Sequence, residues 1–298
     1  VFTTNAASLK SGGSLLDHTQ AATLPDGVRQ AASLTLSLAQ TLGQDRKAMV
    51  KVGTDAVIET DTEGRITLNS DTAIQVDGTL KAPAGTINLN ITTPGKVDAG
   101  FYDAQGIWLG SNARLLATGA FKPLPNGIAL VDGDVLAGGT INLTANRGYI
   151  VTDQYSVMDV SGATASLQFS QPKSGGLGAQ QVTPDIPSAG GAINLTAGEG
   201  IVADGRLKAN AGGQGVGGGT LSVELNGLLR SKPADPIPGG AFPDDGNTAA
   251  PRTIVVTAGN EVFAPANLSP GDGLAANLFS GKALFNASRL NDGNFRAI

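Results

Sequence analysis

The stretch Gly138-Gly139-Thr140-Ile141-Asn142-Leu143-Thr144-Ala145 decides the fold of this 298-residue chain. Its apolar and polar residues alternate, which is typical of a half-buried β-strand with Ile and Leu on one face and Thr and Asn on the other. Similar pentads, each headed by Gly, occur at Gly64-Arg65-Ile66-Thr67-Leu68, Gly85-Thr86-Ile87-Asn88-Leu89, Gly191-Ala192-Ile193-Asn194-Leu195 and Gly219-Thr220-Leu221-Ser222-Val223. Such recurrence predicts a repeat architecture.

A second motif follows several of these strands and supports the same interpretation. Its copies are Leu80-Lys81-Ala82-Pro83-Ala84-Gly85, Met158-Asp159-Val160-Ser161-Gly162 and Leu207-Lys208-Ala209-Asn210-Ala211-Gly212. Ile66 and Ile87 are 21 positions apart, which suits one coil of a parallel β-solenoid, and the longer intervals elsewhere suit a coil with an insertion. We expect roughly ten coils, stacked about 4.8 Å apart, with Gly at corners where the backbone needs a positive φ.

The predicted fold is therefore all-β, a right-handed parallel β-helix (β-solenoid) with extruding loop insertions. Residues 1–47 are expected to pack on the solenoid or cap it, and to include a strand within 28–42. The solenoid itself is expected to occupy 48–298, with insertions at about 94–134, 163–189 and 231–251, the last two rich in Gly and Pro as loops are. The alternative is an antiparallel β-sandwich, which also has short alternating strands but needs no recurring pentad.

The amino-acid composition excludes several classes of protein. The 42 Gly are about twice the average usage, and a hydrophobic fraction of 41% is too high for a disordered chain. A net charge of −5 with scattered basic residues argues against nucleic-acid binding. The sequence has no run of about 18 apolar residues, so no transmembrane helix is expected. The absence of Cys excludes disulfides and thiol catalysis.

The repeats resemble those of the filamentous haemagglutinin-like exoproteins of two-partner secretion systems. The residues that carry the resemblance are the opening stretch followed by Met158-Asp159-Val160-Ser161-Gly162-Ala163, the stretch Gly190-Gly191-Ala192-Ile193-Asn194-Leu195-Thr196-Ala197, and the C-terminal segment from Gly281 to Phe295. The resemblance implies a piece of the shaft, or of a later region, of a large protein secreted to the bacterial surface through an outer-membrane partner. Members of this family act as adhesins, biofilm matrix proteins, haemolysins or carriers of toxins.

One local cluster of aromatic residues is a candidate carbohydrate-binding site. Phe101, Tyr102 and Trp108 lie close together in the first predicted insertion, beside Asp103 and Asn112. Aromatic faces flanked by amides and a carboxylate hold sugar rings by stacking and by directional hydrogen bonds. The alternative is that these rings form a small satellite core over the side or end of the solenoid.

Catalytic and metal-binding patterns are weak in this sequence. His18 is the only His, and it lies in an irregular stretch where an exposed loop residue is the simplest interpretation. The acidic residues Asp55, Glu59, Asp61 and Glu63 could share one outward face, as the carboxylates of solenoid polysaccharide lyases and hydrolases do. Nothing similar recurs on neighbouring strands, so we expect a solvated acidic face, with no metal and no cofactor.

The expected function is that of a non-enzymatic structural or adhesive segment of a secreted or surface-exposed bacterial protein. Its expected partner is a glycan or a cell-surface receptor, and adhesion would serve contact between cells or with a host or matrix. Two alternatives stay open. One is a passive rigid spacer whose parent chain carries a toxin or binding region elsewhere, and the other is a solenoid polysaccharide lyase or hydrolase.

Overall fold

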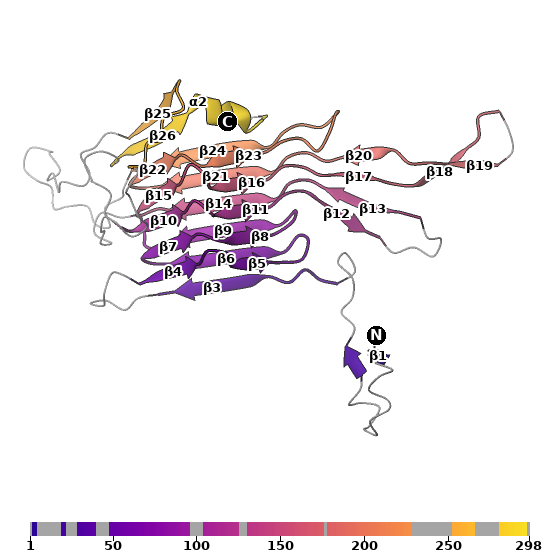
Figure 1. The fold of residues 1–298 in the computed structure, drawn as a ribbon, viewed down its shortest axis with the longest axis horizontal. Helices are drawn as coiled ribbons and strands as arrows, with labels where there is room; N and C mark the ends of the chain where they lie inside the picture. Colours follow the sequence, from indigo (N-terminus) through magenta and orange to yellow (C-terminus); the bar gives the residue numbers. More distant parts are fainter. Residues whose placement is uncertain are drawn as a thin grey trace, which may run out of the picture.

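The computed structural model of this chain describes residues 2–4, 19–21, 29–39, 48–95, 104–124, 130–175, 178–227, 252–265 and 280–296. These residues form strands joined by turns, with one short helix close to the C-terminus (Figure 1). Long parallel sheets run through the molecule, so the prediction of an all-β parallel solenoid is confirmed.

Three parallel sheets, numbered 1 to 3 below, make up the body of the molecule. Sheet 1 contains β3 (Leu34–Leu38), β6 (Arg65–Ser70), β9 (Thr86–Ile91), β14 (Thr140–Ala145), β21 (Ala192–Ala197) and β24 (Thr220–Leu225). Sheet 2 contains β4 (Met49–Val52), β7 (Ala73–Val76), β10 (Gly106–Leu109), β15 (Tyr149–Thr152), β22 (Gly200–Ala203), β26 (Lys282–Asn286) and β25 (Thr253–Thr257). Sheet 3 contains β5 (Val57–Glu59), β8 (Thr79–Lys81), β11 (Arg114–Leu116), β16 (Val157–Asp159) and β23 (Arg206–Lys208).

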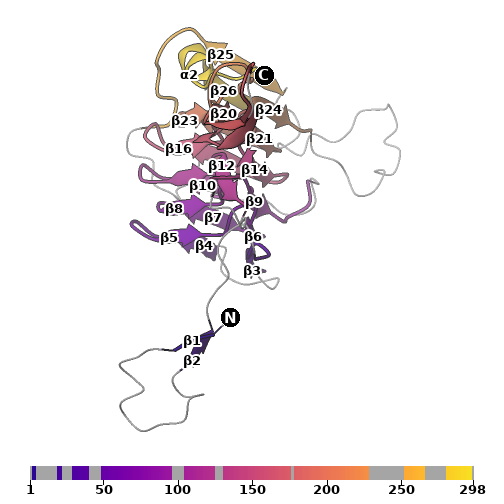
Figure 2. The same ribbon diagram turned by 90° about the vertical axis from the view of Figure 1, so that its right-hand side faces the viewer.

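The chain visits the three sheets in turn, so each coil stacks on the one before it (Figure 2). The described stack is shorter than the ten coils expected from the sequence, because each sheet holds between five and seven strands. At the usual strand spacing of about 4.8 Å this is a body of about 20–30 Å.

The repeated pentads lie directly over one another in sheet 1. Ile141 is the register partner of Ile87 on one side and of Ile193 on the other, and all three side chains are fully buried in the core. Burial of such a column of aliphatic side chains is the main favourable contribution to folding. A single coil has too little apolar surface to be stable, and stacking provides the missing contacts.

The outer face of the same sheet carries a ladder of amide side chains. The Nδ2 group of Asn194 donates a 2.8 Å hydrogen bond to Oδ1 of Asn142, whose own Nδ2 donates to Oδ1 of Asn88 at 2.7 Å. A parallel register brings identical residues together at every step, which is what such a ladder requires. The polar positions of the pentad therefore stabilise the stack from outside while the apolar positions stabilise it from inside.

The glycine that heads each pentad serves close packing, whereas the positive φ expected of corner glycines occurs at others, such as Gly148. Gly85, Gly139, Gly191 and Gly219 are absent from the glycines with positive φ in the described part of the chain. A Cβ atom on Gly139 would overlap the carbonyl oxygen of Gly85, and one on Gly191 would overlap that of Gly139. The recurrent Gly thus marks the point where successive coils approach most closely.

The first predicted insertion, at about 94–134, contains part of the regular solenoid. Strands β10 and β11 lie within that range and pair in parallel with the coils on both sides. All four residues of β10 are buried, so the strand lacks the alternation by which a half-buried strand is recognised. The remainder of that range includes β12 (Ala120–Pro123), which pairs antiparallel with β13 (Gly133–Leu136).

The second predicted insertion, at about 163–189, forms a long antiparallel hairpin. It is made of β17 (Thr164–Ser166) paired with β20 (Asp185–Pro187), and β18 (Phe169–Pro172) paired with β19 (Ala179–Val182). This hairpin and β12–β13 project from the same side of the solenoid (Figure 1). The third predicted insertion, at 231–251, lies outside the described residues.

The two ends of the chain are less regular. At the N-terminal end, β1 (Phe2–Thr4) pairs antiparallel with β2 (Thr19–Ala21), and the strand expected within 28–42 is β3 of sheet 1. At the C-terminal end, β26 lies between β22 and β25 although β25 precedes it in the chain. The helix α2 (Ala287–Asp292) then packs against β23, where a further strand of sheet 3 would otherwise stack.

Candidate functional site

The predicted carbohydrate-binding residues are only partly placed by the structure. Phe101, Tyr102 and Asp103 lie outside the described residues. Trp108 lies on β10 with 4% of its surface exposed, in a small core over the outer face of sheet 2. Asn112 lies in the turn after β10, where its backbone N–H donates a 3.2 Å hydrogen bond to Oδ1 of Asp77. A carbohydrate site at these five residues therefore stays a prediction.

In the core around Trp108, the segment that follows β25 packs against the coils. The indole packs with Tyr149, Val151 and Val202 from successive strands of sheet 2, and Phe263 covers this cluster from the segment that follows β25. The indole Nε1 donates to the carbonyl oxygen of Ala104 at 3.4 Å. In this position the ring contributes to packing between coils, and it does not offer an open face on which a sugar could stack.

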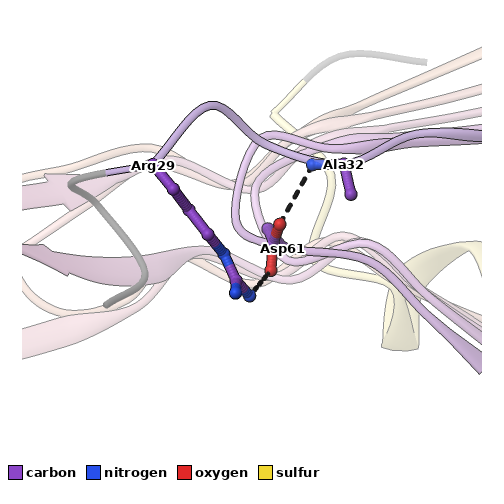
Figure 3. A network of polar contacts seen from close by, with 3 residues as sticks. All are labelled: Arg29, Ala32 and Asp61. Atoms are coloured by element: carbon purple, nitrogen blue, oxygen red, sulfur yellow. Dashed lines mark hydrogen bonds and ion pairs between the residues drawn. The ribbon is translucent and has the colours of Figure 1, made fainter. Parts of the chain in front are cut away.

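The acidic residues between 55 and 63 are held mostly in ion pairs. Glu59 lies 2.7 Å from Lys81 on the neighbouring strand, and Glu63 pairs with Lys122 of β12. Asp61 accepts hydrogen bonds from the backbone N–H of Ala32 at 3.0 Å and from the guanidinium of Arg29 (Figure 3). These two contacts hold the pKa of Asp61 below its ordinary value of 3.8. Each of these three carboxylates therefore has its own basic partner on a neighbouring segment.

His18 lies outside the described residues, so its role is not addressed by the fold. Within the described ranges, no three His, Cys, Asp or Glu side chains are grouped so that they could hold a metal ion. The same part of the chain contains no helix of the length and apolar character needed to cross a bilayer.

Two projecting hairpins form the first candidate site. We call residues 120–136 the short arm and residues 164–187 the long arm. The backbone N–H of Gln168 donates to the carbonyl of Val131 at 2.8 Å, and the backbone N–H of Val131 donates to Oε1 of Gln168 at 2.9 Å. The two arms therefore support each other as they leave the solenoid from successive coils between sheets 3 and 1.

The long arm presents uncharged polar groups to solvent. All four residues of β18 are exposed, and Phe169 is an exposed aromatic residue there, with 40% of its surface accessible. The only charged residues in the described part of this arm are Lys173 and Asp185. Its polar side chains are otherwise amides and hydroxyls: Thr164, Ser166, Gln168, Ser170, Gln171, Ser174, Gln180, Gln181 and Thr183. Such a surface can donate and accept directional hydrogen bonds without attracting strongly charged partners.

A cleft at the C-terminal end of sheet 3 is the second candidate site. It has a volume of about 280 Å³, and it lies where the turn before β16, the outer face of β23 and the helix α2 meet. Its walls include Tyr155, Arg206, Lys208, Asn260, Arg289 and Asp292. Tyr155 is 56% exposed. We call this site the end cleft.

Two carboxylates are buried in the described coils. Glu199 and Arg147 form an ion pair of 2.7 Å, with 1% of each side chain exposed. Burial raises the pKa of Glu199 above its ordinary value of 4.5, although the guanidinium groups of Arg147 and Arg252 oppose the shift. Such a pair is costly to break, because the remaining partner would be a buried and uncompensated charge.

The buried carboxylate of Asp204 connects the segment after β25 to the fifth coil by hydrogen bonds. Its carboxylate accepts backbone N–H groups of Phe263 at 3.0 Å and of Ala264 at 2.9 Å. Burial raises the pKa of Asp204 above its ordinary value of 3.8 and outweighs the opposing effects of those N–H groups and of Arg289. Neither buried carboxylate was singled out from the sequence. Aligning the pentads would have placed Arg147 and Glu199, which follow β14 and β21, one coil apart.

No protein-family model, no curated protein and no solved structure matches this chain.

Proposed function

We propose that this chain is a structural and adhesive segment of a large secreted or surface-exposed bacterial protein, and that the long arm makes the contact. It has no catalytic role in this proposal. Export through an outer-membrane partner of the two-partner type is part of the proposal and rests on the resemblance of the repeats to filamentous haemagglutinin-like proteins. The partner of the long arm is a glycan or a cell-surface receptor.

The observation that carries the proposal is an exposed hairpin, the long arm, that projects from the stacked coils and is hydrogen-bonded at its base. Recognition in repeat proteins commonly lies on insertions that leave one side of the stack. The base of the long arm is fixed by hydrogen bonds to the short arm and to the next coil. Its outer strands β18 and β19 pair only with each other among the described residues. A partner can therefore bind them without breaking any strand pairing of the solenoid.

The experiment compares binding of three forms of the chain to an array of printed glycans. The test variant replaces residues 169–182 with a two-residue Asn-Gly turn, which removes β18 and β19 and leaves every parallel pairing of the solenoid in place. The control variant is Ser222→Ala, an exposed residue on the outer face of β24. Circular dichroism spectra and melting temperatures of all three forms check the fold.

The proposal predicts that the complete chain binds a subset of the glycans, and that the shortened arm lowers this binding at least tenfold while Ser222→Ala leaves it unchanged. Equal binding by the shortened variant would place the contact elsewhere on the molecule. An absence of binding by the complete chain to glycans, and to cell surfaces tested in the same way, would favour the passive spacer.

A further inference from the structure

The end cleft combines an exposed aromatic ring on a hydrogen-bonded turn with positive charge. Arg206 and Lys208 flank the buried Leu207 on β23, so strand alternation directs both basic side chains to the outer face of sheet 3. Arg289 adds a third basic residue from α2, and Asp292 is the single acidic residue of the lining. The cleft is thus locally basic on a chain whose net charge is −5.

Tyr155 is held in place although its side chain is exposed. Its backbone N–H donates a 2.8 Å hydrogen bond to Oδ1 of Asp153, and its carbonyl accepts a 3.1 Å hydrogen bond from the guanidinium of Arg114 on the preceding coil. The turn is closed further by the N–H of Ser156, which donates to the carbonyl of Asp153 at 3.0 Å. Because the backbone of this turn is already fixed, a ligand that stacks on the ring need order only the side chain.

Arg289 maintains the shape of the cleft. Its Nη1 group donates to the backbone carbonyl of Asp204, with a longer contact of 3.4 Å to that of Gln154. The helix α2 is therefore attached to the turns of the fourth and fifth coils on either side of the opening. Arg206 and Lys208 are exposed and are the basic groups best placed to meet a ligand.

We infer that the end cleft binds a sugar residue that carries a carboxylate, such as a uronate. An aromatic ring that lines a cleft is suited to the apolar face of a pyranose, and a basic pair beside it is suited to a carboxylate through charge-assisted hydrogen bonds. Asp292 and Asn260 supply acceptors for sugar hydroxyls. The volume of about 280 Å³ lies at the lower end of ligand-binding pockets, which suits one sugar residue and not a polymer groove.

This site is separate from the long arm, and its ligand class does not depend on the adhesive role proposed above. The two ideas are distinguished by the arm-shortened variant, which retains every residue of the end cleft. That variant is expected to keep the binding of the acidic sugar even where it loses binding on the glycan array.

The test is saturation-transfer difference NMR on the complete chain with methyl β-D-glucuronide, and with methyl β-D-glucoside as the matched neutral sugar. We expect the glucuronide to bind with a dissociation constant on the order of millimolar, as suits a ligand of this size, and the glucoside to bind at least about tenfold more weakly. Arg206→Gln is expected to reduce glucuronide binding about tenfold. Tyr155→Ala is expected to abolish the saturation-transfer signal of the sugar-ring protons. Lys51→Gln, on strand β4 of the first coil, is the control and is expected to leave the binding of both sugars unchanged.

Three results would overturn the inference. One is equal binding of the glucoside, which would show that the carboxylate is not recognised. Another is displacement of the glucuronide by equimolar acetate, which would show a site for small anions alone. The third is glucuronide binding that is absent, or unaffected by both Arg206→Gln and Tyr155→Ala when the variants keep the melting temperature of the parent chain.

Discussion

The hydroxyl of Ser188 donates a 2.8 Å hydrogen bond to the backbone carbonyl of Leu136, a residue 52 positions earlier that ends the short arm. The same oxygen accepts the N–H of Ala163 at 2.8 Å, and the backbone carbonyl of Ser188 accepts the N–H of Gly212 at 2.8 Å. Ser188 is 6% exposed. One buried residue at the base of the long arm therefore links three successive coils, through its hydroxyl and its backbone carbonyl, and this gives a long hairpin a fixed base where it leaves the solenoid.

Replacing this residue by Ser188→Ala is expected to loosen both arms. The change leaves the half-buried carbonyl of Leu136 and the N–H of Ala163 without the hydroxyl, at a cost of about 1–3 kcal/mol. Hydrogen exchange should show faster exchange of amides in 120–124, 133–136 and 164–170, with the strands of sheet 1 unchanged. Ser170→Ala, at an exposed position of β18, is the control. Unchanged exchange in the arms of Ser188→Ala would contradict the role assigned to this hydroxyl.

A second prediction concerns the glycine column of sheet 1. Gly139→Ala places a methyl group against the carbonyl oxygen of Gly85 in the neighbouring coil, and we expect a loss of about 3 kcal/mol in the free energy of unfolding from this overpacking. Gly53→Ala is the matched control, because a Cβ atom there meets nothing within 4 Å. Urea unfolding of both variants measures the difference. Equal stability of the two would show that the coils do not approach as closely as described.

A third prediction uses the buried carboxyl of Asp204. Its pKa is raised in the folded state, so between the unfolded and folded values the folded chain binds more protons than the unfolded chain. The contribution of this group to stability therefore falls as pH rises above about 4. Asp204→Asn removes the titration, so the stability of the parent chain minus that of the variant should decrease with rising pH.

The measurement is urea unfolding of both proteins at a series of pH values from about 2 to 7. Asp61 provides the opposite case for comparison. Its pKa is lowered, so its contribution is present at neutral pH and is lost as pH falls, and Asp61→Asn should show a difference of the reverse slope. A pH-independent difference for Asp204→Asn would contradict the burial assigned to that carboxyl.

Sheet 1 could be predicted from the sequence in detail, and sheet 3 in part, because the second recurring motif contains Leu80, Met158 and Leu207 of β8, β16 and β23. Sheet 2 could not be predicted. The strands of sheet 1 are half-buried, so Ile141 and Leu143 alternate visibly with Thr140 and Asn142. In sheet 2 the strands β10, β15 and β22 are buried on both faces and have only four residues each, so no alternation marks them. This is why β10 falls inside the predicted insertion at about 94–134, and β11, which follows it after a short turn, falls there with it.

The candidate sites show a similar contrast. The long arm could be located as a loop from its Gly and Pro content, but its antiparallel pairing is not visible in a run of exposed polar residues such as those of β18. The end cleft could not be predicted at all. The residues that line it are as far apart in the sequence as Gln154 and Asp292. Only the stacking of the coils, together with the packing of α2 on β23, brings them to one surface.

The register of the stacked coils is the claim on which the arms and the end cleft both depend, and cysteine cross-linking tests it most directly. The chain has no native Cys, so a double variant contains only the introduced pair. Asn142 and Asn194 are register partners on adjacent parallel strands, about 4.8 Å apart, which is within the range for a disulfide. Asn142 and Thr196 share the same face but are offset by two residues, at roughly 8 Å, which is out of reach.

Under mild oxidation, the variant with Asn142→Cys and Asn194→Cys is predicted to form an intramolecular disulfide in nearly all molecules, seen as a change in mobility on a non-reducing gel and as the loss of two hydrogen atoms by mass spectrometry. The variant with Asn142→Cys and Thr196→Cys is predicted to stay reduced. Efficient cross-linking of the offset pair, with none of the aligned pair, would contradict the parallel register and with it the placement of both sites.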